Sequence, residues 1–544
     1  MYEVTNQPPP LEPYNLLQTD CVLHEALLRE HAGWAETELA ALGKTLGGPQ
    51  TIRLGFEANR NPPLLQAFDR YGHRIDEVEF HPAWHALMSI AVEAGLHSSP
   101  WARPGPGAHV ARAAGTYMLV QVESGVYCPI AMTYGSVPAL RHAPAIAAQW
   151  LPRLFGRKYD PRCRPADEKH GALIGMAMTE NQGGSDLRTN TSRAELDRGT
   201  GSRRCFRLTG HTWFMSAPMC DAFLVLAQSN GRLSCFLVPR WTPDGERNTI
   251  NILRLKDKLG NRSNASSEVE FIEAHAELVG EEGRGIPTII EMTNYTRLDC
   301  AIGSSGLMRQ AVVQAIHHAS HRIAFQKRLI DQALMTNVLA ELALESEAAT
   351  VLTMRLARAY DEDDELAAVW RRVLTPAAKF WICKRAPFLA AEAMEVLGGS
   401  GYVEECVLPR IYRELPVNSI WEGAGNIMCL DVLRALDRTA GSVELLLHEL
   451  ADGAHADKRL QAVVARLERQ LKGRGRTDES QARVITRDLV LASQGALLLR
   501  HSPAAVADAF CASRLGEEPG GAFGLLPPGA DLRSIVERAA PTVH

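Results

Sequence analysis

The chain has 544 residues, which is too many for one compact core, so we expect two to four domains. Hydrophobic residues make up 46% of the chain and charged residues 22%, as in an ordinary soluble globular protein. The net charge of −5 excludes a uniformly basic nucleic-acid-binding protein, although it leaves room for a local basic patch.

Cysteine usage and the N-terminus indicate the compartment. Eleven cysteines are scattered singly, without a C-x-x-C pair, which favours reduced thiols over a disulfide framework or a zinc site. The chain starts with Pro8-Pro9-Pro10 in an extended arm instead of a charged and then apolar signal, and no apolar run approaches the length of a membrane span. We therefore expect a cytoplasmic protein with no membrane partner.

Helical, then β, then helical patterns follow one another along the chain. After the arm of residues 1–20 the pattern is mostly helical to about residue 170, and short β-type runs bounded by turn residues follow. Helical spacing returns near residue 287, and a further helical tail begins at about 441. The clearest segments are helices at 21–42, 84–94 and 376–396 and strands at 206–212, 221–228, 234–239 and 267–271.

This order predicts an α+β protein that is mainly α, in four consecutive domains. They are an N-terminal arm and helical domain (1–175), a β domain (176–285), a helical domain (286–440) and a helical tail (441–544). Two smaller features are interpreted as structural. The acidic run at 361–365 is expected to be a solvated helix end or loop. His81 and His85 have i, i+4 spacing but lack a nearby acid motif, so we expect no metal site.

Glycine, hydroxyl and aromatic residues gather where the β region begins. Met178 and Thr179 lead into Gly183-Gly184-Ser185, whose free N–H groups and hydroxyl suit a phosphate or the polar edge of a flat ring. About 25 residues later come Trp213, Phe214 and Ser216, which offer aromatic faces for stacking and a hydroxyl for hydrogen bonding. A glycine pair alone is more often a plain turn, and aromatic residues in strands are more often core.

A lone carboxylate, Glu422, stands between an aromatic residue and a glycine. An aromatic neighbour such as Trp421 excludes water, which raises the pKa of a carboxylate toward the value that a general base needs. Gly423 lets the backbone pass close to a ligand. About twenty residues upstream, Gly398 and Gly399 form a second place where backbone can approach a large planar ligand. Taken alone, Glu422 also fits an acid at a helix entry, and the spacing to these glycines favours the site.

Together these segments resemble the acyl-CoA dehydrogenase flavoprotein family. The motifs that carry the resemblance are Thr179-Glu180 with Gly184-Ser185-Asp186, Phe214 with Ser216, Lys258-Leu259-Gly260, Arg322 with Phe325, and Trp421-Glu422-Gly423. They follow in the family's order over about 250 residues. The resemblance implies the acyl-CoA dehydrogenase fold, with an N-terminal helical domain, a middle β-barrel domain and a C-terminal four-helix bundle, to which this chain adds a helical domain at its C-terminal end.

The resemblance also implies FAD as the cofactor and Glu422 as the base that removes the α-proton of the substrate. The residues that it places at the cofactor are Met178, Thr179, Gly183, Gly184, Ser185, Trp213, Phe214, Ser216, Arg322, Gly398, Gly399, Trp421, Gly423 and Asn426. Arg322 is expected to reach the FAD diphosphate of a neighbouring subunit. Two residues depart from the family pattern and bear on the adenosine side: Gln326 replaces a glycine, and Glu395 replaces a glutamine.

The match is tighter to one branch of the family, the flavoproteins of the bacterial adaptive response to DNA alkylation. Residues 80–85, 256–266 and 412–423 carry this resemblance, which spans nearly the whole chain and is weakest beyond about 440. It implies a homotetramer with one FAD per subunit and a C-terminal helical domain that binds double-stranded DNA.

The tail contains a basic segment between residues 458 and 476. Apolar residues recur in it at helical spacing, which buries one stripe and turns most charges outward. Its basic residues are Lys458, Arg459, Arg466, Arg469, Lys472, Arg474 and Arg476, which face only Glu468. The segment fits a solvated helix face as well as phosphate contact. If four of these residues per protomer contacted phosphates, log affinity would fall with log salt at a slope of roughly −3 to −4.

Two functions therefore stay open. The first is an FAD-containing, double-stranded-DNA-binding protein of the alkylation-damage response, which retains the dehydrogenase site for an acyl-CoA or another small-molecule substrate. The second is a catabolic acyl-CoA dehydrogenase that acts on short branched acyl-CoA and carries an appended oligomerisation domain. The basic segment favours the first function, and the Glu422 motif is compatible with both.

Overall fold

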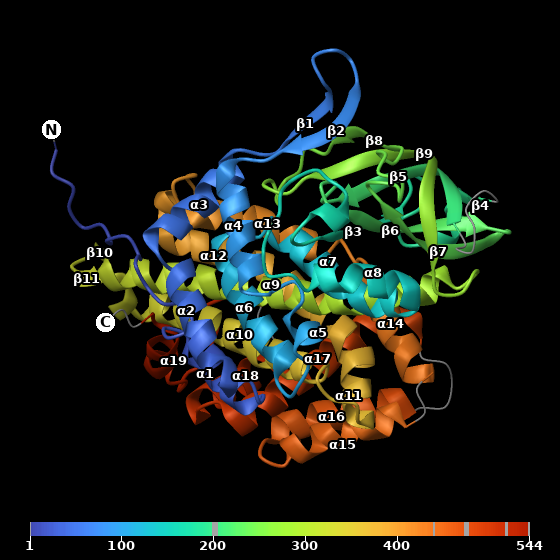
Figure 1. Ribbon diagram of the computed structural model, residues 1–544. Helices are drawn as coiled ribbons and strands as arrows, with labels where there is room; N and C mark the ends of the chain where they lie inside the picture. Colours follow the sequence, from blue (N-terminus) through green and yellow to red (C-terminus); the bar gives the residue numbers. More distant parts are fainter. Residues whose placement is uncertain (1, 198–204, 439–440, 473–477, 517–520, 542–544) are drawn as a thin grey trace. The chain divides into compact units, whose positions relative to one another are not determined.

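The computed structural model describes residues 2–197, 205–438, 441–472, 478–516 and 521–541 (Figure 1). The chain forms two compact units. The first unit combines Met1–Pro49, Gly105–Val122 and Arg297–His544, and the second unit combines Gln50–Pro104 and Glu123–Thr296. Each unit is thus assembled from separated stretches of chain, and the division into four consecutive domains stays a prediction.

The second unit contains a small β-barrel, drawn in green in Figure 1. Its strands are β3 (Ile174–Thr179), β4 (Arg193–Leu196), β5 (Cys205–Ser216), β6 (Ala222–Ser229), β7 (Arg232–Pro239), β8 (Ile250–Leu255) and β9 (Ser266–Val279). Among the described residues they pair in the order β3-β5-β4-β6-β7-β9-β8, with further β3–β6 and β5–β9 pairs. The four predicted strands lie in β5, β6, β7 and β9 to within one residue, and they place Phe206, Phe236 and Phe271 in the core.

The rest of the second unit is helical except for one hairpin. Its helices are α3 (Pro49–Arg60), α4 (Pro82–Glu93), α5 (Ser99–Ala102), α7 (Tyr127–Arg141) and α8 (Pro144–Leu154). Strands β1 (Leu64–Phe68) and β2 (Arg74–Glu79) form an antiparallel hairpin in a stretch for which the sequence predicted helix. Its turn contains Gly72 with φ +89°, a conformation that a continuous helix does not allow. The prediction of a mostly helical region up to about residue 170 did not include this hairpin.

His81 and His85 have structural contacts in the second unit. His81 precedes α4, and its Nδ1 accepts the backbone N–H of Ala83 at 3.2 Å. The Nδ1 of His85 hydrogen-bonds the hydroxyl of Tyr159 at 2.9 Å, and the two rings stack. Burial lowers the pKa of His85, so the ring favours its neutral form.

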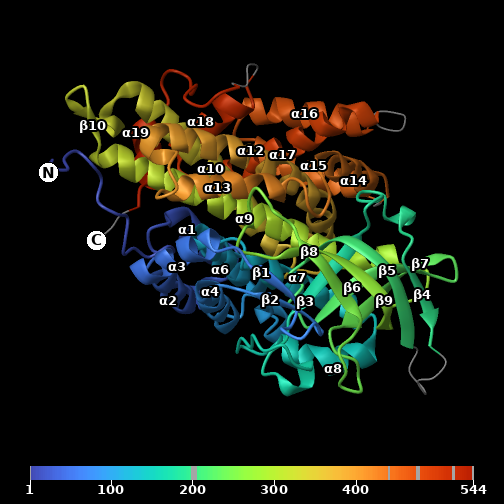
Figure 2. The same ribbon diagram turned by 90° about the horizontal axis from the view of Figure 1, so that it is seen from above.

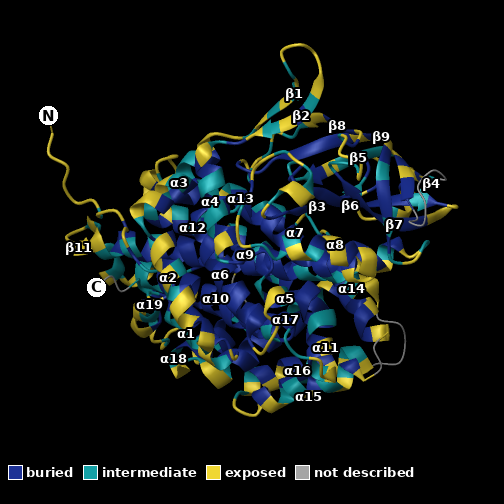
Figure 3. Ribbon diagram, in the orientation of Figure 1, coloured by how far each residue is buried: buried dark blue, intermediate teal, exposed yellow. Residues whose placement is uncertain are grey.

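The first unit consists of helices and one short hairpin, which is formed by the two-residue strands β10 (Ile323–Ala324) and β11 (Lys327–Arg328). They begin with α1 (Cys21–Arg29), α2 (Glu36–Leu46) and α6 (Ala108–Val122), and continue with α9 (Gly285–His321), which starts in the second unit. They then include α10 (Ala333–Arg358), α11 (Glu365–Val369), α12 (Thr375–Leu397), α13 (Val407–Asn418) and α14 (Gly425–Arg438). Every residue of α6 is buried. Figure 3 colours the ribbon by the burial of each residue. Two helices replace the single helix predicted at 21–42, because His31 adopts φ +66° after α1.

The C-terminal residues form α15 (Ser442–Ala454), α16 (Lys458–Lys472), α17 (Ala482–His501), α18 (Ala504–Arg514) and α19 (Leu532–Ala539), shown in orange to red in Figure 2. Buried ion pairs attach this tail to α10. Arg514 pairs with Glu341 at 2.7 Å and with Glu345 at 3.0 Å, and Arg538 pairs with Glu347 at 3.0 Å. The tail is therefore fixed on the helices of its own unit by charges that become costly when one partner is removed.

The acidic run at 361–365 is less solvated than predicted. Asp364 caps α11 by accepting the backbone N–H of Ala367 at 2.8 Å. Asp361 accepts the backbone N–H of His109, at the start of α6, at 2.9 Å. Burial raises the pKa of Asp361 to about 7, although the hydrogen bonds from α6 lower it. Local charge density alone did not indicate that this end of the run packs against another helix.

All eleven cysteines are free thiols. Among the described residues, no helix combines the length and the apolar character needed to cross a membrane. Likewise, no cluster of three or more histidine, cysteine, aspartate or glutamate side chains with the geometry of a metal site occurs in the part of the chain that the structure describes.

Candidate functional site

The predicted cofactor residues divide between the two units. The residues from Met178 to Ser216 belong to the second unit, whereas Arg322, the glycines 398 and 399, and residues 421–426 belong to the first.

In the second unit, strand pairing brings together motif residues that lie far apart in the sequence. Strands β3 and β5 are antiparallel, with Thr179 opposite Phe214 and Met176 opposite Ser216. Phe214 is 50% exposed although it is a large apolar side chain. The ammonium of Lys256 lies 4.8 Å from the centre of the Phe214 ring and 3.5 Å from that of Trp213. An exposed aromatic face beside a cation and a hydroxyl fits a flat, anionic cofactor.

A buried carboxylate organises the loop that carries the glycine pair. Glu180 accepts the backbone N–H groups of Thr191 at 2.7 Å and of Ser192 at 2.8 Å, and also bonds Gln182. Burial raises the pKa of Glu180, but these hydrogen bonds outweigh burial and lower it to about 2. Glu180 therefore stays ionised and ties both ends of the loop together. The sequence placed Glu180 in the motif without assigning it this role.

The two glycines of this loop have different surroundings. A Cβ at Gly183 would lie 2.3 Å from the Thr189 hydroxyl, so a larger residue there requires the Thr189 side chain to move. A Cβ at Gly184 would meet nothing within 4 Å, and Ser185 is exposed. The backbone at Gly184 is thus open to a ligand, which fits the cofactor contact that the motif predicts.

In the first unit, the loop between α13 and α14 holds Glu422 in an unusual backbone conformation. Glu422 has φ +59° and Gly423 has φ +106°, so two successive residues lie in the left-handed region. Arg297 Nε donates to the carbonyl oxygen of Glu422 at 3.0 Å, and Lys379 Nζ donates to that of Gly423 at 2.7 Å. Two cations from different helices therefore hold the loop that carries the predicted base.

Arg297 is itself held by a shared carboxylate. Asp431, on α14, pairs with Arg297 at 2.9 Å and accepts two hydrogen bonds from Arg372, at 2.9 and 2.8 Å. Burial raises the pKa of Asp431, but Arg372 and Arg297 outweigh burial and lower it. These residues were missed from the sequence because Arg297 lies 125 residues from Glu422, and no local pattern marks the contact.

The glycines among the other predicted cofactor residues of the first unit leave room for a large ligand. Gly398 ends α12 with φ +61°, and a Cβ at Gly398 or Gly399 would meet nothing within 4 Å. The indole N–H of Trp421 is buried and has no hydrogen-bond acceptor among the described residues. A buried donor of this kind suits a polar atom of a bound group. Asn426, exposed at the start of α14, accepts a hydrogen bond from Arg483 Nε at 2.9 Å.

Arg322 and the two departures from the family pattern lie near chain turns and helix ends. Arg322 donates to the backbone carbonyl of Asn6 at 2.7 Å, so it holds the N-terminal arm of its own chain. Gln326 has φ +65° in the β10–β11 turn, which explains why glycine suits this position. Glu395 is exposed on α12. The nearby Glu392 has a raised pKa because it is partly buried and because the charge of Glu395 lies close to it.

The basic residues of the tail are partly neutralised. On α16, Arg459 pairs with Asp457 and Asp508, Arg466 pairs with Asp488, and Lys472 pairs with Glu468. Lys458 and Arg469 are exposed and have no ion pair among the described residues. Arg474 and Arg476 lie outside the described residues. The structure therefore presents fewer uncommitted charges on this helix than the sequence suggested.

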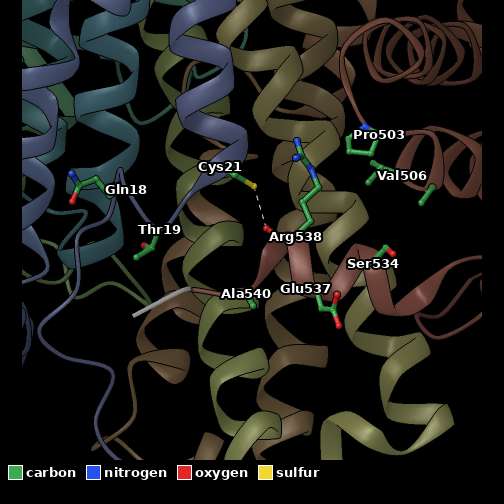
Figure 4. Close-up of a pocket in the computed structure, with 10 residues that line it drawn as sticks. Gln18, Thr19, Cys21, Pro503, Val506, Ser534, Glu537, Arg538 and Ala540 are labelled. Carbon is green, nitrogen blue, oxygen red and sulfur yellow. Dashed lines mark hydrogen bonds between the residues drawn. The ribbon is translucent and has the colours of Figure 1, made fainter. Parts of the chain in front are cut away.

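A cavity of about 390 Å³ lies between the N-terminal arm, α18 and α19 (Figure 4). It is lined by Thr19, Cys21, Val506, Glu537 and Arg538 among others, and by none of the predicted site residues. Cys21 Sγ donates to the Arg538 carbonyl at 3.2 Å, and burial raises the pKa of this thiol. The guanidinium of Arg538 is committed to Glu25 and Glu347.

Three family profiles match successive parts of the chain. The adaptive response protein AidB N-terminal domain matches residues 6–161. The middle domain of acyl-CoA dehydrogenase matches residues 175–274, and its C-terminal domain matches residues 283–436. The tail helices lie beyond these matches.

Individual proteins are similar over nearly the whole chain. The putative acyl-CoA dehydrogenase AidB of Escherichia coli (strain K12) is 49% identical over 514 residues, 94% of each chain. Acyl-CoA dehydrogenase family member 11 of Caenorhabditis elegans is 31% identical over 72% of this chain and 65% of its own. The crystal structure of Caenorhabditis elegans ACDH-11 in complex with C11-CoA has a TM-score of 0.85 at 26% identity, covering 95% of this chain and 94% of that one.

Proposed function

The chain belongs to the acyl-CoA dehydrogenase family, and from this premise we propose that Glu422 is the base of a retained dehydrogenase site. Members of the family carry FAD, so FAD is the cofactor of this chain. The observation that carries the proposal is the Glu422–Gly423 loop, whose two left-handed residues are held through their carbonyls by Arg297 and Lys379. Such strain is kept where a side chain must be aimed at a reacting atom.

The chain's own residues bind and orient in this reaction. The Glu422 carboxylate removes the α-proton of an acyl thioester, while Trp421 keeps water from the carboxylate. The backbone N–H of Glu422 donates to the thioester carbonyl as negative charge develops there. FAD held there would supply the acceptor for the β-hydrogen, which leaves the substrate as a hydride. Gly184 and the exposed Phe214 provide the open backbone and the aromatic face for the cofactor.

The test of this site is bleaching of the flavin by acyl-CoA under anaerobic conditions. Purified protein should bleach with at least one acyl-CoA of a series that includes short branched chains. Glu422→Gln should retain FAD and lose bleaching by about 10²-fold or more, because a general base is removed. Glu405→Gln, an exposed acid of the loop after α12, is the control and should behave as wild type. Equal bleaching by wild type and Glu422→Gln would refute the assignment.

For the tail we propose contact with double-stranded DNA, as part of an alkylation-damage response in the cytoplasm. Lys458 and Arg469 support this proposal, because they are exposed and carry no ion pair among the described residues. Two phosphate contacts per protomer give a slope of log affinity against log salt of about −2, shallower than the segment's composition suggests. Several copies in a homotetramer would add avidity. The exposed Phe325 and Leu334, at 93% and 85%, support an assembly that covers them.

Point substitutions test this proposal better than removal of the tail, because removal would take away the tail arginines that pair with the buried Glu341 and Glu347. Lys458→Glu with Arg469→Glu should weaken duplex binding and flatten its salt dependence, with flavin content unchanged. Arg53→Glu with Arg188→Glu changes the net charge equally on exposed residues of the second unit, and should leave binding as in wild type. Absence of salt-sensitive duplex binding by wild type would refute the proposal.

The alternative function is a catabolic acyl-CoA dehydrogenase that acts on short branched acyl-CoA. One observation favours it: three of the five described basic residues of the predicted DNA-binding segment are neutralised by carboxylates. Of the three cited pairs, Lys472–Glu468 is exposed on both sides; such a pair contributes only about 0–1 kcal/mol and can open toward a phosphate. Rapid bleaching by a short branched acyl-CoA, together with no duplex binding, would select the alternative.

A further inference from the structure

Lys379 is a buried cation without a carboxylate partner. It lies on α12 and is only 1% exposed, which is rare for an ammonium. Among the described residues it forms no ion pair within 4.0 Å, and its Nζ donates to the Gly423 carbonyl oxygen at 2.7 Å. Burying an ammonium costs several kcal/mol unless nearby groups compensate its charge. Its retention at this place therefore requires a physical reason.

Lys379 and Glu422 both act electrostatically on one buried thiol, that of Cys300. The thiol of Cys300, buried on α9, has a raised pKa because of burial; Lys379 lowers this pKa, whereas Glu422 and Asp299 raise it. Lys379 and Glu422 therefore both lie within electrostatic reach of the same sulfur atom. Asp299 is neutralised by Arg112, with two hydrogen bonds of 2.6 and 2.8 Å. The remaining charges of this set are the Lys379 ammonium and the Glu422 carboxylate.

The hydrogen bond of Lys379 acts on a strained backbone. Glu422, a residue with a Cβ, adopts φ +59°, a conformation that costs about 1–2 kcal/mol for an L-residue. The carbonyl of Glu422 is held by Arg297, and the next carbonyl, that of Gly423, is held by Lys379. Loss of Arg297 would free the peptide between Glu422 and Gly423, and loss of Lys379 would free the next peptide, between Gly423 and Ala424. Rotation of either peptide would turn the Glu422 carboxylate away from its direction.

We propose that Lys379 is a positioning residue for the Glu422 base: its buried ammonium fixes the Gly423 carbonyl and so keeps Glu422 in the left-handed conformation that aims its carboxylate. The proposal rests on the proposed role of Glu422. Lys379 does not touch the substrate in this role; it acts through the loop. A hydrogen bond from a charged donor is among the stronger hydrogen bonds in proteins, and it offsets the strain at Glu422.

The test compares Lys379→Met with Arg385→Met by two measurements. Arg385 lies on the same helix and pairs with the buried Glu345, so its loss also perturbs α12 but leaves the Glu422 loop untouched. In Lys379→Met, amide hydrogen exchange of residues 421–426 should rise about tenfold or more, because a charge-assisted hydrogen bond is lost. Turnover of an acyl-CoA should fall about 100-fold with KM nearly unchanged, as expected for a misplaced base. Arg385→Met should change neither measurement.

A second variant and the exchange measurement keep the proposal decidable. Lys379→Gln retains an N–H donor and should recover part of both effects; it also replaces the methionine variant if that variant does not fold. Unchanged loop exchange and turnover in Lys379→Met, or equal losses in Arg385→Met, would overturn the proposal. If the wild type turns over no acyl-CoA, the proposed dehydrogenase function fails, whereas loop exchange still decides the role of Lys379.

Discussion

The attachment of the C-terminal tail depends on Arg514, and its removal is the most direct test of the ion pairs on α10. Arg514 donates to Glu341 at 2.7 Å and to Glu345 at 3.0 Å, and all three side chains are nearly inaccessible to solvent. Glu345 has a second partner, Arg385, at 3.2 Å. Burial raises the pKa of Glu345, but Arg514 and Arg385 outweigh burial and lower it, so Glu345 is ionised at neutral pH.

The cost of Arg514→Met follows from these contacts. Removing one partner of a buried ion pair typically costs about 3–5 kcal/mol, because the other charge stays buried without compensation. Arg385 continues to neutralise Glu345, so we expect the lower end of the range, about 3 kcal/mol, from the stranded Glu341. At 1.36 kcal/mol for each factor of ten, this corresponds to an increase of roughly 150-fold in the local opening equilibrium of the tail.

Hydrogen exchange of α17 and α18 is the appropriate assay, because a chain of two units need not unfold in one step. Arg500→Met is the control: Arg500 pairs with Glu449 and Asp452 on the partly exposed surface of the tail, and its loss should cost less than about 1 kcal/mol. Adding Glu341→Gln to Arg514→Met should recover part of the loss. Equal exchange in Arg514→Met and Arg500→Met would refute the reasoning.

Three further predictions concern other parts of the chain. Gln326→Gly should be tolerated and Gln326→Val should destabilise the β10–β11 turn by about 1 kcal/mol, as thermal unfolding would show, because φ at this position is +65°. The pKa of Asp361 is about 7, above its unfolded value, so its contribution to stability falls as pH rises from about 4 to 7. The melting temperature of Asp361→Asn, measured relative to wild type, should therefore be higher at pH 8 than at pH 5. A difference that does not change with pH would contradict this prediction. Gly183→Ala should destabilise the apoprotein by its clash with Thr189, whereas Gly184→Ala should leave the apoprotein unchanged and lower flavin retention; full retention in Gly184→Ala would remove Gly184 from the cofactor site.

Motifs whose chemistry is local were recognisable without coordinates. Short β-type runs bounded by turn residues located β5, β6, β7 and β9. The order of glycine, aromatic and acidic motifs identified the acyl-CoA dehydrogenase family, which the family profiles confirm. The exchange of glycine for Gln326 was also visible, and the structure adds its reason, a left-handed turn. The roles of the individual cofactor residues stay predictions.

Contacts between distant residues required the tertiary structure. From its flanking residues alone, Glu422 is a carboxylate between an aromatic residue and a glycine. The left-handed loop at Glu422 is held by Arg297 on α9, which lies 125 residues earlier in the sequence, and by Lys379 on α12. Both contacts follow from the packing of these two helices. The arginines of α16 are likewise less available to a ligand than the sequence suggested, because folding places Asp488 and Asp508 beside them. The sequence determines which charged and apolar side chains are available. The energetic effect of each charge depends on how much solvent folding removes from it and on which partners folding places beside it.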